Sequence, residues 1–134
     1  MAKISTKIKS SDWRNLPIER WNVASFTAFI TDTTREKYGV EYQPGGKGAK
    51  NQRWARERGM LKQAQGTYGN AVLRKFIELC WREYTPKAEF PYPTWTFMYS
   101  YMDRNFAKAQ AEVARANRAQ AVPTQDIEEI AEWL

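Results

Sequence analysis

The sequence predicts an all-α fold. Apolar residues recur at the three- and four-residue spacing of helices over several long stretches, and little alternating strand pattern is present between them. The loops between these stretches carry the prolines and most of the glycines, which regular structure does not tolerate. Within this class we expect a helix-turn-helix-like core of three helices, closed by a long fourth helix and followed by a short acidic C-terminal segment.

Length and composition agree with one hydrophobic core. The chain has 134 residues, of which 43% are hydrophobic, and it includes six Trp, seven Tyr and six Phe. Each aromatic ring buries a large area, so a core rich in rings is expected. No apolar run approaches the roughly 18–20 residues that span a bilayer, so no membrane partner is expected.

The chain begins with a basic stretch, residues 1–11, in which three lysines stand among Ser and Thr. No apolar stretch follows, so we expect a mobile basic arm and not a secretory signal. The next segment contains large apolar residues that are expected to anchor it to the core: Trp13, Leu16, Ile18 and Trp21. The helical domain is predicted to cover residues 12–122.

Three helices are predicted in the first two thirds of the chain. The first spans residues 23–38, with Asn22 as its N-cap and Gly39 just beyond its end. The second spans about 50–65 and ends at Gly66. The third begins after Asn70, a good N-cap residue, and reaches about residue 84; the short turn before it gives the pair its helix-turn-helix character.

The last helix is predicted to run without a break from an N-cap at Thr94 to about Ala121. It carries a heptad seam, with bulky residues first and small ones later: Trp95, Tyr99, Met102, Phe106, Ala109, Val113 and Ala116. Such a seam, over residues 95–116, also predicts self-association. Pro123 then marks a linker that separates residues 123–134 as a tail.

The most informative stretch is PGGKGAKNQRWARERGMLKQ, residues 44–63, in which six residues are Lys or Arg and one is Glu. Glycines let a backbone approach phosphates, and a helix N-terminus presents N–H donors to anions. The predicted phosphate contacts are Lys47, Lys50, Arg53, Arg56, Arg58 and Lys62, with Arg74, Lys75 and Arg82 extending the surface. A helical wheel does not put these cations on one stripe, so an ordinary solvated helix is the alternative interpretation.

Aromatic residues near these loops are candidates for stacking with bases, because every base has a flat face. The candidates are Tyr38, Tyr42, Tyr68, Tyr92 and Tyr99. The alternative interpretation is that the core needs these rings.

Most enzyme chemistry is not expected. The chain has no His and a single Cys, Cys80. These counts remove the commonest general base, the usual nucleophile pairs, a structural zinc site and an internal disulfide, and they favour a reduced intracellular setting. The GGKG segment lacks the spacing and the Ser or Thr of a P-loop. We therefore expect no catalytic residues, no metal and no cofactor.

Charge divides the chain into two parts. The net charge is +6, and four carboxylates on the last nine residues leave +10 on residues 1–125. A basic body and an acidic tail predict two different partners. The tail is amphipathic, and its expected partner-binding residues are Ile127, Ile130, Trp133 and Leu134. It could also fold over the basic body and compete with nucleic acid.

Four stretches together form one recognisable pattern: DWRNLPIERWN, YGVEYQP, GTYGNAVLRKFIELCWREY and YPTWTFMYSYMDRN. In this pattern a Tyr-Gly pair ends one helix, a basic helix follows, and a Pro-Thr pair opens the last helix. This pattern, over about residues 13–105, resembles a group of small bacteriophage-encoded helical proteins. The terminal IEEIAEWL also looks like short tails with which phage proteins bind sliding clamps or polymerases. The resemblance implies a role in phage DNA replication or transcription in the host cell cytoplasm.

The function expected from these features is that of a non-enzymatic nucleic-acid-binding accessory factor. It would hold DNA through the basic loop and helix, and recruit a replication or transcription protein through the tail. Two alternatives stay open: a modulator that binds a host protein such as RNA polymerase or a nuclease, and an assembly or structural component.

Overall fold

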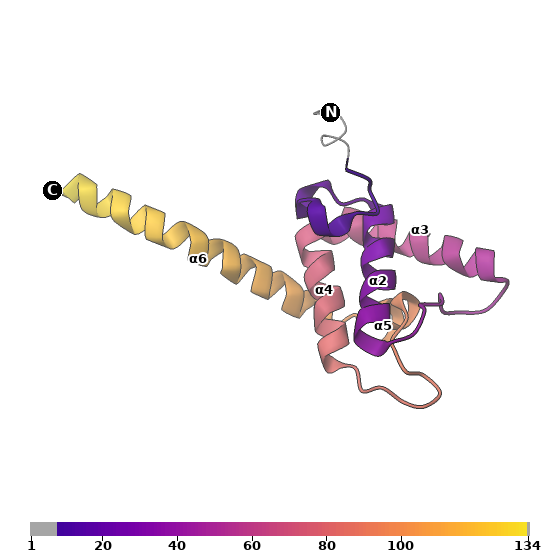
Figure 1. The fold of residues 1–134 in the computed structure, drawn as a ribbon. Helices are drawn as coiled ribbons and strands as arrows, with labels where there is room; N and C mark the ends of the chain where they lie inside the picture. The colour runs from indigo at the N-terminus through magenta and orange to yellow at the C-terminus, as the bar shows by residue number, and fades with distance from the viewer. Residues whose placement is uncertain (1–7, 134) are drawn as a thin grey trace.

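The computed structural model describes the backbone of residues 8–133 and the side chains of residues 8–120. Its order is two short 3-10 turns, η1 (Trp13–Asn15) and η2 (Ile18–Arg20), followed by α2 (Val23–Tyr38), α3 (Lys50–Tyr68), α4 (Asn70–Glu83), α5 (Trp95–Tyr101) and α6 (Asn105–Trp133). The predicted all-α class is confirmed, since the described residues contain no strand. Figure 1 shows α2, α3, α4 and α5 gathered in one body, with α6 leaving it as a long projection.

Helix α2 has the bounds that its local sequence predicts. The Asn22 side chain accepts a hydrogen bond from the Ser25 backbone N–H at 3.1 Å, and the Ser25 hydroxyl accepts one from the Asn22 N–H at 3.1 Å. Gly39 follows the helix with φ of 73°, a left-handed conformation in which a side chain is strained. The caps at both ends are local. Ser10 adds two contacts at the N-terminal end, because its backbone oxygen accepts from the Ser25 hydroxyl at 2.7 Å and its hydroxyl oxygen accepts from the Asn22 amide at 3.0 Å.

Helices α3 and α4 meet more closely than predicted. α3 continues through Gly66 to Tyr68, and Gly69 with φ of 83° is the one residue between the helices. The prediction that Asn70 caps α4 is wrong. Its side-chain amide instead donates to the backbone oxygens of Ile18 at 2.7 Å and Trp21 at 2.9 Å, which fixes η2 against the start of α4.

The predicted single helix over residues 94–121 is wrong, because it is divided between Tyr101 and Asn105. Met102 leaves helical geometry with φ of −121°. Asn105 is buried, and its side-chain amide donates to the Glu83 carboxylate at 3.3 Å. The break gives each half its own direction, so that both α5 and the start of α6 pack their apolar faces into the core.

The predicted linker at Pro123 is also wrong at the level of secondary structure, since α6 continues to Trp133. A proline inside a helix removes one backbone hydrogen bond. Ala, Gln and Glu, which favour a helix, recur on both sides of it, at positions 119–121, 125, 128 and 129, and support continuation.

The core is built largely from rings. Phe106 of α6 stacks on Phe76 of α4 with ring centroids 3.7 Å apart, and on Tyr68 of α3 at 4.0 Å. Trp13 and Trp21 pack edge to face on each other at 5.9 Å and both contact Phe29, which confirms that the segment before α2 is anchored to the core.

The heptad seam is divided by burial. Trp95, Met102 and Phe106, together with Ala109, lie in the chain's own core and are not available to a second copy. Val113 is half-buried and Ala116 is exposed. Self-association through the whole seam is therefore incompatible with this fold, and only the second half of the seam is open to a partner.

In the part of the chain that the structure describes, no helix is both long and apolar enough to cross a bilayer.

Candidate nucleic-acid interface

The loop before α3 is folded around an arginine. We call residues 44–49 the glycine loop. Arg56 reaches back from α3, and its Nη2 donates to the backbone oxygen of Lys47 at 2.9 Å. Gly46 has φ of 94°, and a Cβ on it would lie 2.5 Å from Arg56 Nη1. The positive φ is what favours a glycine here, because the flexible end of Arg56 could move away from a Cβ.

A second arginine braces the other end of the loop. Arg53 is half-buried, and its Nη1 donates to the backbone oxygen of Pro44 at 2.9 Å. The guanidinium groups of Arg53 and Arg56 therefore both bind loop carbonyls, and each keeps further N–H donors because a guanidinium has five.

Glu57 is the residue that the sequence interpretation missed. It is 3% exposed, although it lies in the middle of the basic stretch. One carboxylate oxygen accepts from the Tyr42 hydroxyl at 2.6 Å. The other accepts from the Gly45 N–H at 3.1 Å, the Thr96 N–H at 3.0 Å and the Thr96 hydroxyl at 2.7 Å. This side chain joins the glycine loop, α3 and the start of α5.

Tyr42 completes this buried cluster. Its hydroxyl oxygen also accepts from the Trp95 N–H at 2.8 Å, so it both donates and accepts. Burial, followed by the neighbouring Glu57 carboxylate, raises the pKa of Tyr42 well above its ordinary value. With four donors satisfied, Glu57 has a structural role, and its charge faces inward.

Helical spacing would have identified Glu57. It lies three residues after Trp54, four before Leu61 and seven before Ala64, which places all four on one face of α3. Leu61 and Ala64 are buried and Trp54 is half-buried. A single acid on the apolar face of a helix indicates a buried carboxylate with partners elsewhere.

The cations of α3 lie on two sides of that buried face. At about 100° per residue, Arg53 and Arg56 fall on one side and Arg58 and Lys62 on the other. Lys47 is exposed on the loop, and Lys50 is exposed at the first position of the helix. Within the described side chains, none of these six cations forms an ion pair, and the stretch between Glu41 and Glu78 contains no acid besides Glu57.

The three predicted cations of α4 are placed differently. Arg74 is half-buried, donates to Glu78 at 3.3 Å, and lies over the Trp21 ring at 5.0 Å. Lys75 contacts Glu78 at 3.6 Å and Glu112 at 4.0 Å. Arg82 is exposed near the end of the helix. Arg74 and Lys75 thus stabilise the packing of α4 and have little charge free for another ligand.

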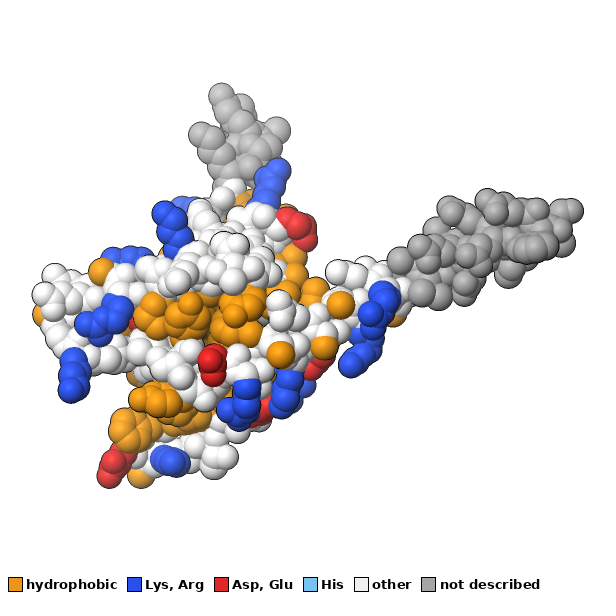
Figure 2. Space-filling model, turned by 180° about the vertical axis from the view of Figure 1, so that it is seen from behind, with side chains coloured by type: hydrophobic (Ala, Val, Ile, Leu, Met, Phe, Trp, Pro, Cys, Tyr) orange, Lys and Arg blue, Asp and Glu red, His pale blue; other side chains and the backbone are white. Residues whose placement is uncertain are grey.

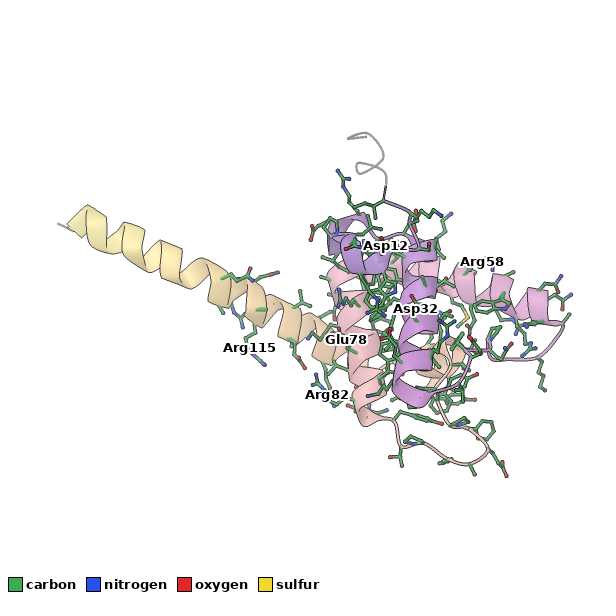
Figure 3. The ribbon with its side chains drawn as sticks, viewed as in Figure 1. Asp12, Asp32, Arg58, Glu78, Arg82 and Arg115 are labelled. Atoms are coloured by element: carbon green, nitrogen blue, oxygen red, sulfur yellow. The ribbon has the colours of Figure 1, made fainter. Side chains whose placement is uncertain are left out.

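The predicted cations do not form one patch. In Figure 3, Arg58 lies on α3, Arg82 near the far end of α4, and Arg115 on α6, well separated from one another. Figure 2 shows a face on which hydrophobic side chains gather in the middle and Lys and Arg stand apart around them. Among the predicted cations, Arg53 and Arg56 contact the glycine loop that carries Lys47, whereas Arg58 and Lys62 lie on the other side of α3.

The predicted tail residues fall at the edge of the described chain. Ile127, Ile130 and Trp133 belong to the backbone of α6, and their side chains lie outside the described ones. Leu134 lies outside the described residues altogether.

Comparison of the chain with protein-family models, with curated proteins and with solved structures gave no match.

Proposed function

We propose that this chain is a non-enzymatic nucleic-acid-binding protein that holds phosphates with its glycine loop and α3. One observation carries the proposal: the single acid of this stretch, Glu57, is turned inward, and the six cations have no carboxylate partner among the described side chains. Five of them are exposed and Arg53 is half-buried. Such a surface attracts polyphosphates and releases their counterions on binding.

The start of α3 supports the same assignment. Ala49 precedes the helix and has no side-chain acceptor, so it cannot satisfy the first N–H groups of α3. Lys47 and Lys50 are exposed on either side of this position. Free N–H donors and two ammonium groups at one helix end suit a phosphate oxygen. In Figure 1 this end of α3 extends beyond the other helices of the body, where a long polymer can reach it.

A helix-turn-helix interpretation of α3 and α4 would instead put α4 into a DNA groove. We assign the contact to α3, because Arg74 and Lys75 of α4 are half-buried and engaged with Glu78. Phosphate contacts from a loop and a helix end do not read base sequence, so the proposed binding has little sequence preference.

The proposal extends to the biological setting that the sequence resemblance implies. The chain would act as an accessory factor in phage DNA replication or transcription, in the host cell cytoplasm. The acidic end of α6 would recruit a replication or transcription protein. The alternative, a modulator that binds a host protein directly, predicts binding that depends weakly on salt.

The test is binding of fluorescent oligonucleotides, measured over a range of salt concentrations. Two double variants are compared with the parent: Lys47→Gln/Lys50→Gln in the proposed interface, and Arg115→Gln/Arg118→Gln on α6 as a control with the same loss of charge. Each lost phosphate contact should reduce the slope of log K against log salt by about one. We therefore expect a change of about two for the interface variant and little change for the control.

Two results would contradict the proposal. The first is that neither single-stranded DNA, double-stranded DNA nor RNA binds the parent at low salt. The second is that both double variants lose affinity equally, which would show a general charge effect without a localised interface.

A further inference from the structure

An aromatic pocket lies directly beside the glycine loop. It has a volume of about 530 Å³ and is formed by α5, the segment between α4 and α5, and Gly45 and Gly46 of the loop. Five of its lining residues are aromatic: Tyr84, Phe90, Tyr92, Phe97 and Tyr101. Its volume is in the range of pockets that bind small molecules or single groups of a larger ligand.

The rings of this pocket lie mostly outside the core, although Tyr92 packs against it. Trp95 and Met98 of α5 are fully buried, while Phe97 is 39% exposed and Tyr101 is 71% exposed. Phe90, across the pocket, is 63% exposed. A short helix that is aromatic on its outer face as well as its inner one exposes apolar surface to water, and such a surface indicates a binding site.

The exposed rings are held in place. Phe97 contacts Tyr101 with centroids 5.2 Å apart, and Tyr84 packs edge to face on Phe97 at 5.9 Å. The Tyr84 hydroxyl donates to the Phe90 backbone oxygen at 2.6 Å. Lys87 and Phe90 exchange two backbone hydrogen bonds of 3.1 Å. The contacts among Tyr84, Phe97 and Tyr101 reduce the side-chain freedom that a stacking ligand would have to remove, which favours affinity.

The pocket and the glycine loop form one unit. Glu57 binds the Gly45 N–H and the Thr96 N–H through the same carboxylate oxygen, at 3.1 and 3.0 Å. Gly45 also packs closely on Thr94, since a Cβ on it would lie 2.5 Å from the Thr94 hydroxyl oxygen. Lys87 is part of the pocket wall, and Lys47 is exposed two residues after Gly45. The pocket wall therefore includes one cation, and the adjoining loop carries another.

We infer that this pocket binds unpaired nucleobases, so that the nucleic acid held by the glycine loop is single-stranded. The inference rests on the function proposed above. Bases in a duplex are already stacked on their neighbours, whereas an unpaired base can place its face on a ring while its phosphates reach nearby cations. Stacking and phosphate contact need to be close together in space, and the glycine loop and the pocket satisfy this requirement.

The rings that the inference uses differ from most of those expected from the sequence. Tyr42 is buried in the Glu57 cluster. Tyr68 is stacked on Phe106, and Tyr99 on Trp95 at 5.3 Å. Tyr92 lines the pocket, but its hydroxyl accepts from the Gln43 N–H at 2.9 Å and helps to hold the loop.

The experiment separates base stacking from phosphate binding. Fluorescence anisotropy is measured with an oligothymidine, with an abasic oligomer of equal length and therefore equal charge, and with a duplex. We expect the parent to bind the oligothymidine about 5- to 150-fold more tightly than the abasic oligomer, the range that stacking of one base gives. Tyr101→Ala should remove most of this difference, and Tyr101→Phe, which keeps the ring, should retain it.

A second alanine variant, at a different ring of the pocket, is a control for misfolding of the first. Phe97→Ala is compared with the parent by far-UV circular dichroism before its binding is measured. Lys47→Gln/Lys50→Gln should weaken the oligothymidine and the abasic oligomer equally.

Equal affinity of the parent for these two oligomers would overturn the inference and leave the proposed function intact. An unchanged oligothymidine affinity in both alanine variants would also overturn it, and would assign the aromatic surface to a protein partner. Absence of all nucleic-acid binding by the parent would instead contradict the proposed function itself.

Discussion

Replacing Glu57 by Gln removes a buried negative charge while keeping the size of the side chain. The carbonyl oxygen of Gln can accept from Gly45 and Thr96, as one carboxylate oxygen does in the parent. Its amide nitrogen then faces the Tyr42 hydroxyl, which loses its acceptor. The perturbation is therefore one lost hydrogen bond to a charged group and three that become neutral.

The magnitude follows from these four contacts. A hydrogen bond to a charged group contributes about 1.5–3 kcal/mol, and a neutral one about 0.5–1.5 kcal/mol. The lost bond and the three weakened bonds together cost about 4.5–7.5 kcal/mol on this scale. A neutral amide is easier to bury than a carboxylate, which offsets part of the cost. We expect a net loss of about 2–4 kcal/mol in the free energy of unfolding, a large share of the roughly 5–15 kcal/mol typical of a domain.

Urea unfolding followed by tryptophan fluorescence measures this loss, because Trp21, Trp81 and Trp95 are buried. The matched control is Arg58→Gln, an exposed neighbour on the same helix, which should stay within about 0.5 kcal/mol of the parent. Combining Glu57→Gln with Tyr42→Phe should show a coupling above about 0.5 kcal/mol, since the two side chains share a hydrogen bond. A loss below 0.5 kcal/mol for Glu57→Gln, or strict additivity in the double variant, would refute the structural role of this carboxylate.

Three further predictions concern single residues. Gly39→Ala places a side chain at φ of 73° and should lower the free energy of unfolding, measured by thermal unfolding, by about 1 kcal/mol. Gly66→Ala lies inside α3 with open space around it and should raise the free energy of unfolding by up to about 1 kcal/mol. Stability changes of the same sign in the two variants would contradict the assigned backbone conformations. Cys80 is buried, and burial raises the pKa of its thiol to about 12. Iodoacetamide at pH 8 should therefore modify it only after denaturant is added, and rapid labelling of the native chain would show that the thiol is accessible. The pKa of Tyr42 is raised from the ordinary 10.0, so the folded state holds the hydroxyl proton of Tyr42 more tightly than the unfolded state does. The resulting contribution to the free energy of unfolding is complete below pH 10 and is lost as the pH rises through the raised pKa. Unfolding at alkaline pH should show this loss, Tyr42→Phe should reduce it, and an identical alkaline profile in the two proteins would count against it.

What could be predicted from the sequence is mostly what neighbouring residues determine. The bounds of α2 follow from Asn22 with Ser25 at one end and from Gly39 at the other, and all of these contacts are local. The anchoring of Trp13 and Trp21 follows from the large apolar area of their rings.

What could not be predicted depends on contacts between distant segments. The heptad seam runs without interruption through Met102, and no proline or glycine marks the break between α5 and α6. The break is stabilised instead by contacts of Asn105 and Lys108 with Glu83 of α4, which are more than twenty residues away in the sequence. In the candidate interface, too, the sequence shows which residues are charged but not which way each side chain points. Its cations are visible in the sequence, but the inward direction of Glu57 depends on Tyr42 and Thr96.

The projecting helix α6 also acts as a lever. It is held on the body where Phe106 stacks on Phe76 and Tyr68 and as far as the contact of Glu112 with Lys75, and the 20 residues from 114 to 133, at 1.5 Å each, give an arm of about 30 Å. A tilt of about 5° at the base of this arm moves the distal end by about 3 Å, by the same helical rise. Repacking of those three rings would thus be amplified into a displacement that anything attached to the far end of the arm must follow.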